Sequence, residues 1–415
     1  MRRGGALASI VASVATALAA CGSLLLLSAC GSCDSTVVQT PMPVLASGSF
    51  DGVAVDQGSH LVYLADRSHK GVDVVDVGGV SPRFVETVPL DGPPSGLALG
   101  ADRQRLYVAE AKGVVAVIDT AGAPKTPLSV VGRIQADPTG VDLLDYSAAN
   151  GRVYAGNGSG GQVVVIDADT QKVIDSIPVN VPVQQPRFDA ADGMLYVTAA
   201  GDDPLLRVDP TQRVVTRSFP LKGCRASGLA INPSRQLAMV ACGGSMALFN
   251  LTTGTSQVSR AVAGGDLVEY DASADRFVVA SPHGAHDSSI GVYYGDGSFL
   301  GSIAVPPIAH GAVIADNDGR VYAPGAAGLT SFAPATCAPP PDWASFLLGL
   351  SPFAVPLAVF ALILFLYARR QDRLEASGER PVPAWRRKLE YLDEERRRMR
   401  ELEDAILDVR PDPPA

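Results

Sequence analysis

The middle of this 415-residue chain repeats one pattern seven times. Each copy has a short apolar strand, a polar turn, a strand of the Leu-Tyr-Val type, a turn, and a further strand. The clearest pair is GVAVDQGSHLVYLADRSHKGVDVVDV at 52–77 and GLALGADRQRLYVAEAKGVVAVIDT at 96–120. One residue of the second strand marks each copy, and these landmark residues are Tyr63, Tyr107, Tyr154, Tyr196, Met239, Val278 and Tyr322. Successive landmarks are 44, 47, 42, 43, 39 and 44 residues apart.

Seven units of this length, with strand-type alternation and turn signals, predict a β-propeller. A single four-stranded blade cannot bury both of its faces, but blades packed in a ring cover one another. The last copy offers only three strands, and an extended stretch at 36–45 precedes the first copy. We therefore expect an all-β, seven-bladed propeller over residues 30–337 that is closed by this N-terminal strand, because closure removes an exposed strand edge. The aspartates expected to cap the turns after the third strands are Asp76, Asp119, Asp167 and Asp209.

The repeat resembles the YVTN/YncE-like family of seven-bladed propellers. The resemblance rests on the Leu-Tyr-Val-Ala strands, the Val-x-Val-Ile-Asp strands and the x-Gly-Leu-Ala strand openings, and it covers roughly residues 36–336. It implies the propeller fold. It also implies a binding or scaffold module, because members of that family mostly have no shared catalytic set.

The two ends of the chain differ from the repeats. Arg2 and Arg3, followed by apolar and small residues, have the form of a secretory signal peptide over residues 1–29. After a linker at 338–343, residues 344–368 are almost wholly apolar, and 25 helical residues are enough to cross a bilayer. The alternative, a buried core helix, is disfavoured by this length. Three arginines follow, so the positive-inside rule places the 369–415 tail in the cytoplasm and the propeller outside.

Four of the six cysteines form two expected disulfides. Cys33 lies just before the closing strand and Cys337 just after the strand expected beside it. Because neighbouring strands of a blade are antiparallel, these two positions are expected to be close enough for a disulfide. The same reasoning pairs Cys224, before the inner strand of the fifth blade, with Cys242 at the end of its second strand. Two such pairs are typical of an oxidising, extracytoplasmic compartment.

A fifth cysteine, Cys30, is interpreted as a lipid anchor. Leu27-Ser28-Ala29-Cys30 resembles the lipobox of bacterial lipoproteins, which implies a thioether-linked lipid on Cys30. A second copy ends at Cys21 but would leave the apolar run at 24–27 outside the signal. The alternatives are an uncleaved N-terminal membrane helix and a redox pair of Cys30 with Cys33, for which no βαβ context exists. We therefore expect a protein of the bacterial cytoplasmic membrane, anchored by a lipid and by a helix.

Polar residues gather where the chain is expected to enter the inner strands, at one mouth of the propeller channel. Twelve residues before each landmark stand Asp51, Ser95, Asp142, Gln184, Ser227, Asp266 and His310. Asp266, His310 and Asp51 belong to neighbouring blades, so they are expected side by side. With Asp142 they offer the oxygen and imidazole ligands that metals accept, and close carboxylates raise one another's pKa. The alternative is that these residues only solvate the mouth.

The remaining composition limits the partners. The net charge of −9 argues against nucleic acid, because phosphate binding needs a basic face. In the tail, AWRRKLEYLDEERRRMRELEDAILDV predicts a charged helix that is either solvated or docks a protein partner.

Two functions follow from these features. The first is a membrane-anchored, non-enzymatic binding or scaffold module, such as an accessory subunit of a membrane complex, with no cofactor. The second is an enzyme whose mouth residues hold a divalent metal for hydrolysis or lactone chemistry. The sequence shows no base or nucleophile with recognisable supporting residues, which favours the first.

Overall fold

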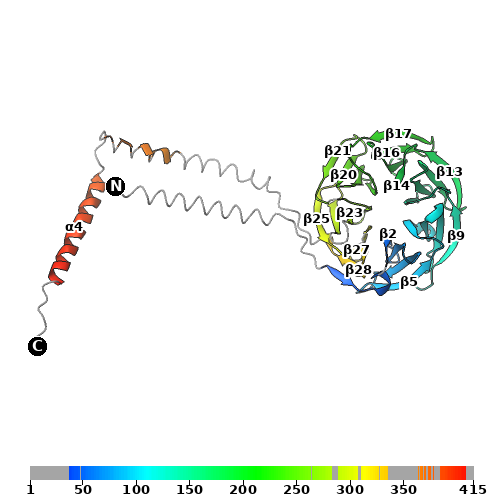
Figure 1. The fold of residues 1–415 in the computed structure, drawn as a ribbon, viewed down its shortest axis with the longest axis horizontal. Coiled ribbons are helices and arrows are strands. Elements are labelled where there is room, and N and C mark those ends of the chain that lie inside the picture. The colour runs from blue at the N-terminus through cyan, green and yellow to red at the C-terminus, as the bar shows by residue number, and fades with distance from the viewer. Residues whose placement is uncertain are drawn as a thin grey trace, which may run out of the picture. The chain divides into compact units, whose positions relative to one another are not determined.

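Seven sheets in a ring make up most of the molecule. The computed structural model describes residues 37–46, 48–262, 264–282, 288–306, 310–326, 328–334, several positions between 363 and 377, and 384–407. The chain divides into two units, residues 1–341 and 342–415, which are described separately. In the described part of the first unit, the strands form seven four-stranded sheets. Their circular arrangement (Figure 1) confirms the predicted all-β, seven-bladed propeller.

Each of the first six repeats supplies one blade, and its strands run in chain order across the sheet. Blades one to four are β2 (Phe50–Asp56), β3 (Leu61–Asp66), β4 (Gly71–Asp76), β5 (Arg83–Pro89); β6 (Pro94–Gly100), β7 (Arg105–Glu110), β8 (Val114–Asp119), β9 (Ser129–Gln135); β10 (Leu144–Ser147), β11 (Arg152–Asn157), β12 (Gln162–Asp167), β13 (Lys172–Pro178); and β14 (Val183–Asp189), β15 (Met194–Ala199), β16 (Leu205–Asp209), β17 (Val214–Phe219). Blades five and six are β18 (Leu229–Asn232), β19 (Leu237–Cys242), β20 (Ser245–Asn250), β21 (Ser256–Ser259); and β22 (Val268–Asp271), β23 (Arg276–Ser281), β24 (Ser289–Tyr294), β25 (Phe299–Ala304). Short 3-10 turns, η1 (Ala101–Arg103) and η2 (Ala111–Gly113), flank β7. Figure 1 shows β2 and β14 toward the centre of the ring and β5, β9, β13 and β17 on its outside.

The burial of each strand follows its position in the blade. All six residues of β3 are buried, and so are five of the six in β4. Both faces of these middle strands are covered by neighbouring blades, which is why they read as apolar runs rather than as alternating patterns. The outer strand β9 instead alternates between exposed residues and residues that are partly or fully buried, because one of its faces meets solvent.

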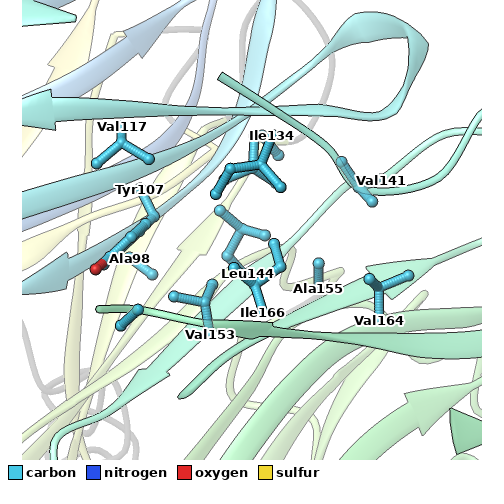
Figure 2. Close-up of a cluster of buried hydrophobic side chains, with 13 residues drawn as sticks. Ala98, Tyr107, Val117, Ile134, Val141, Leu144, Val153, Ala155, Val164 and Ile166 are labelled. Atoms are coloured by element: carbon cyan, nitrogen blue, oxygen red, sulfur yellow. The ribbon is translucent and has the colours of Figure 1, made fainter. Parts of the chain in front are cut away.

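The core lies between adjacent blades. In one cluster, Tyr107 and Val117 of blade two pack against Leu144, Val153 and Ile166 of blade three (Figure 2). Burying one such side chain contributes about 1.5–3 kcal/mol. Similar clusters recur around the ring, so each blade is stabilised mainly by its neighbours.

The seventh blade is built from both ends of the propeller sequence. It contains β26 (Val313–Ala315), β27 (Arg320–Gly325), β28 (Gly328–Phe332) and β1 (Val38–Thr40). Strand β1 pairs antiparallel with β28, with Val38 opposite Ser331, which confirms closure by an N-terminal strand.

The closing strand is shorter than the predicted 36–45. It ends at Thr40, because Pro41 has no N–H to donate to a ladder, and Pro43 begins the short helix α2 (Pro43–Ala46). Leu45 of α2 is fully buried.

The aspartate caps predicted after the third strands are present. The carboxylates of Asp76, Asp119, Asp167 and Asp209 accept hydrogen bonds from the backbone N–H of Gly78, Ala121, Thr170 and Thr211 at 2.8–2.9 Å.

The second unit contains the helix α4 (Ala384–Leu407), where the sequence predicts a charged helix. Leu389, Leu392 and Met399 on it are exposed. Among the residues that the structure describes, no helix is both long and apolar enough to span a membrane. Most of the predicted span, 344–368, lies outside those residues, so the span stays a prediction.

Candidate functional site in the central channel

The residues predicted at the channel mouth come together around the ring. His310 Nδ1 lies 2.6 Å from Asp266 Oδ2, which links blades six and seven. The charge of Asp51 also acts on His310, and that of Asp142 acts on Asp51. The structure therefore brings Asp51, Asp142, Asp266 and His310 into one electrostatically coupled group.

Hydrogen bonds fix the other mouth positions between blades. Ser95 Oγ donates to the carbonyl of Asp142 at 2.9 Å, and Ser227 Oγ donates to the carbonyl of Asp266 at 3.0 Å. Gln184 lies at the same level in β14, but it is its neighbour Gln185 that donates to the carbonyl of Leu144 in blade three. Serines at these positions thus position the loops that carry the acids.

Arg67 belongs to the mouth although the sequence reasoning missed it. It follows β3, and its guanidinium contacts Asp51 Oδ2 at 2.8 Å. Inner and second strands are antiparallel, so the end of each second strand returns to the mouth where the inner strand begins. That topology is the signal that could have identified Arg67.

The mouth carries more carboxylates than cations. Burial, and then the charge of Asp142, raise the pKa of Asp51 above its usual range. Burial and the charge of Asp266 likewise raise the pKa of Asp142, against the opposing effects of Ser95 and Arg67. The hydrogen bond to Asp266 raises the pKa of His310, although burial opposes it. A proton on His310 and a nearby external cation are both favoured by this excess of negative charge.

A second level of charged residues lies deeper in the channel, and the sequence reasoning missed it too. We call it the waist, and it consists of the inner-strand residues opposite the landmarks: Ala54, Ala98, Asp145, Arg187, Ala230, Glu269 and Val313. Arg187 Nη2 contacts Glu269 Oε1 at 2.6 Å, and Arg187 Nη1 lies 3.4 Å from Asp145 Oδ1. The ion pair of Arg187 with Glu269 joins blades four and six, past blade five.

The waist borders empty space. One cavity of about 200 Å³ and another of about 320 Å³ share the lining residues Asp145, Tyr146, Arg187, Glu269 and Tyr270. Burial raises the pKa of Glu269 and of Asp145, and Arg187 opposes both shifts.

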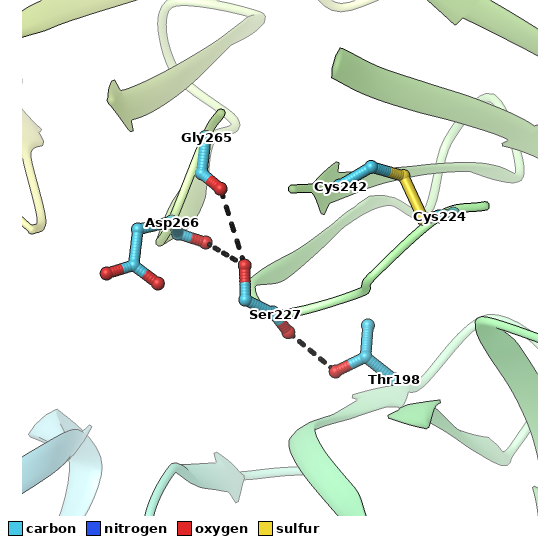
Figure 3. The surroundings of a disulfide bond; sticks show 6 residues. All are labelled: Thr198, Cys224, Ser227, Cys242, Gly265 and Asp266. Carbon is cyan, nitrogen blue, oxygen red and sulfur yellow. Dashed lines mark hydrogen bonds between the residues drawn. A yellow bond between two sulfur atoms is a disulfide. The ribbon is translucent and has the colours of Figure 1, made fainter. Parts of the chain in front are cut away.

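The predicted disulfide beside the mouth is present. Cys224 and Cys242 are bonded, with their Cα atoms 4.8 Å apart. Figure 3 shows this bond near Ser227, whose carbonyl accepts a hydrogen bond from Thr198 Oγ1 at 2.6 Å. The disulfide therefore holds the segment that leads into the mouth of blade five. Cys30, Cys33 and Cys337 lie outside the described residues, so the lipid anchor and the second disulfide stay predictions.

A metal centre does not emerge from the geometry. Within the described ranges, no three His, Cys, Asp or Glu side chains form a group that could hold a metal ion. The mouth residues instead engage Arg67, His310 and loop carbonyls. A divalent metal, which the sequence leaves open beside the alternative that these residues only solvate the mouth, thus stays a hypothesis.

Comparison with known proteins adds no identity. No family model matches the sequence, and no curated protein is significantly similar to it. The structure shows the seven-bladed fold. The resemblance to YVTN/YncE-like propellers is based on the sequence repeat alone.

Proposed function

We propose that this chain is a binding or scaffold module whose propeller stands outside a bacterial cytoplasmic membrane and is held there by its two ends. The observation that carries the proposal is the composition of blade seven. Strand β1 pairs with β28, so the segments before Val38 and after Phe332 both join the same blade. Two anchors on one blade would hold the propeller close to the bilayer.

The fold and the channel support a binding role. A seven-bladed ring presents loops around a central channel, and here the channel carries charged groups at two levels beside cavities. The same surfaces suit an accessory subunit that contacts a membrane protein through the propeller, the apolar segment or the tail.

Two further observations support the anchoring. The Cys224–Cys242 disulfide is of the kind found in oxidising compartments. Cys33 precedes Val38 by 5 residues, and Cys337 follows its partner Ser331 by 6. This near-symmetric spacing supports a second disulfide at the base of blade seven. A lipid on Cys30 and a helix over 344–368 would then act together, because a single acyl chain binds membranes only reversibly.

The anchoring is tested by expressing the full chain in bacteria with a radiolabelled fatty acid and separating membranes from soluble protein. We expect label on the wild type and on Cys21→Ser, but not on Cys30→Ser. Cys30→Ser combined with deletion of 344–415 should release the propeller from the membrane. Label that survives Cys30→Ser, or a doubly altered chain that stays membrane-bound, would contradict the proposed anchors.

The scaffold role is tested by extraction in a mild detergent followed by mass spectrometry of co-purifying proteins. We expect a defined membrane protein at a constant ratio to the chain, lost when 344–415 is deleted but kept in Cys30→Ser. A chain that purifies alone under every mild condition would count against the subunit role.

A further inference from the structure

We propose that helix α4 pairs, parallel and in register, with α4 of a second copy of this chain, so that the protein self-associates through its second unit. This inference goes beyond the proposed function, which requires anchors and a partner but no self-association. It begins from the surface of α4 (Ala384–Leu407), a helix of 24 residues. Leu389, Leu392 and Met399 on this helix keep 52%, 43% and 60% of their surface exposed.

These three apolar residues share one face of the helix. Leu392 follows Leu389 by three positions, and Met399 follows Leu392 by seven, which is the core spacing of a coiled coil. Leu389 then occupies position a of the heptad, and Leu392 and Met399 occupy position d. We call these residues the α4 stripe. Apolar residues at such positions are covered by pairing with another helix.

The face of α4 opposite the stripe is charged. The described residues at its outer positions b, c and f are Glu390, Tyr391, Glu394, Arg397, Arg398 and Glu401. On this outer face, Arg397 Nη2 contacts Glu394 Oε2 at 3.6 Å. Such a face is suited to water, so the α4 stripe is the side on which a second helix would pack.

The charges that border the stripe identify the second helix as another copy of α4. In a parallel, in-register pair, position g of one helix faces position e of the next heptad of the other. Lys388 then faces the partner's Asp393, and Glu395 faces the partner's Arg400. All four residues are exposed in the structure. Both contacts join opposite charges, and two-fold symmetry makes each of them twice, so the helix is complementary to itself.

The same charges oppose other registers. Sliding one helix by a heptad places Lys388 against Arg400 and Glu395 against Asp393, so that like charges meet on both sides of the pair. In an antiparallel pair, position e faces e and position g faces g, so the contact of Glu395 with the partner's Arg400 is absent. This contact is therefore specific to the proposed arrangement.

Two charged residues at core positions limit the strength of the pair. Arg396 and Glu403 occupy position a, and a charged residue there lowers the stability of a coiled coil while it restricts the register. In the parallel pair, a residue at position a packs beside position g of the partner, so Arg396 lies next to the partner's Glu395. Its apolar stem can stay at the interface while the guanidinium reaches water. We therefore expect a weak, reversible dimer.

The test is sedimentation equilibrium of the purified full chain in a density-matched detergent over a range of protein concentrations. We expect a monomer–dimer equilibrium. Leu392→Ala should raise the dissociation constant of the dimer about tenfold or more, because it removes buried methyl groups from both helices. Alanine is the strongest helix former, so this loss cannot come from unfolding of α4. The matched control is Tyr391→Ala, one residue earlier and 65% exposed, which should associate like the wild type.

An exchange of charges tests the direction and the register. Glu395→Arg places like charges opposite Arg400 on both sides of the dimer and should weaken it about tenfold. Adding Arg400→Glu to the same chain restores opposite charges, so the double variant should associate like the wild type. Glu401→Arg makes the same charge change at an outer position and should have no effect.

A variant that gains affinity guards against a folding artefact. Arg396→Leu replaces the charged core residue with an apolar one and should tighten the dimer. A chain that is monomeric at every concentration, a dimer that survives Leu392→Ala, or a charge exchange that fails to restore association would overturn the proposal. The measurement needs no second protein and no lipid on the chain, so this inference and the proposed function fail separately.

Discussion

Asp73 is a buried carboxylate at a strand position where blades two and three have small or apolar residues. It occupies the third position of β4, where β8 and β12 have Ala116 and Val164. The side chain is fully buried, with Oδ1 accepting from Thr87 Oγ1 at 2.5 Å and Oδ2 without a hydrogen bond. Burial, and then the nearby Asp66 carboxylate, raise the pKa of Asp73 to about 6 despite Thr87. A proton on Asp73 would let it donate to Asp66, which itself contacts His69 Nδ1 at 2.5 Å.

We expect Asp73→Asn to stabilise the folded chain at pH 7.5. A raised folded-state pKa means that the stabilisation from Asp73 is complete below about pH 4 and is lost as the pH rises through about 6. Asparagine keeps an acceptor for Thr87 and a donor for Asp66 without the charge, so the gain at pH 7.5 is about 1–3 kcal/mol. Thermal and urea unfolding at pH 4.5 and 7.5 measure it, with exposed Asp202→Asn as the control. A gain that is larger at pH 4.5 than at pH 7.5 would contradict this assignment.

At the scale of the element, the end of the second strand is linked to the segment that leads into the inner strand of the same blade. The link is a hydrogen bond or a disulfide, and we call the two linked residues tied. In five blades the two tied residues are 17 or 18 positions apart. The tied pairs are Asp66 with Ser49, Glu110 with Gly92, Asn157 with Thr139, Cys242 with Cys224, and Ser281 with Gly264. The disulfide of blade five is therefore the covalent form of a contact that its neighbours make with hydrogen bonds.

Replacing both Cys224 and Cys242 with alanine should lower the free energy of unfolding by about 2–4 kcal/mol, because the bond closes a loop with a sequence separation of 18. Urea unfolding of the full chain in detergent without reductant measures the difference. Cys21→Ser, which lies outside the repeats, serves as the control and should unfold like the wild type. A double variant as stable as this control would show that the tie adds nothing to the blade.

These periodic features are what the sequence alone could predict. The landmark spacing predicted the number of blades, the closing strand and the Cys224–Cys242 bond, because each depends only on position within a repeat. The pairing of Arg187 with Glu269 escaped prediction because it crosses from blade four to blade six. That contact depends on the curvature of the ring and on the small side chain of Ala230 between them, neither of which a count along the chain contains.

Considered as a whole, the molecule closes its ring inside blade seven, where β1 from the start of the propeller pairs with β28 from its end. Strand β1 contributes only three residue pairs with β28, from Val38 to Thr40. Much of the remaining closure comes from α2, where Leu45 is fully buried in a cluster that joins Val313 and Tyr322 of blade seven to Val62 and Leu64 of blade one. Leu45 therefore packs between the first and the last blade and contributes to the contact between them.

This position makes Leu45→Ala a test of how the ring is held. Truncating a fully buried leucine costs about 2–5 kcal/mol, since it removes buried methyl groups and leaves a cavity. Every blade is stabilised by its neighbours, so loosening the contact between blades seven and one exposes a face on each and should lower the unfolding midpoint of the whole propeller. Val44→Ala, one residue earlier in the same helix but 38% exposed, is the matched control and should stay within about 0.5 kcal/mol of the wild type. If the two variants unfold alike in urea, closure depends on the short β1–β28 ladder rather than on the packing of α2.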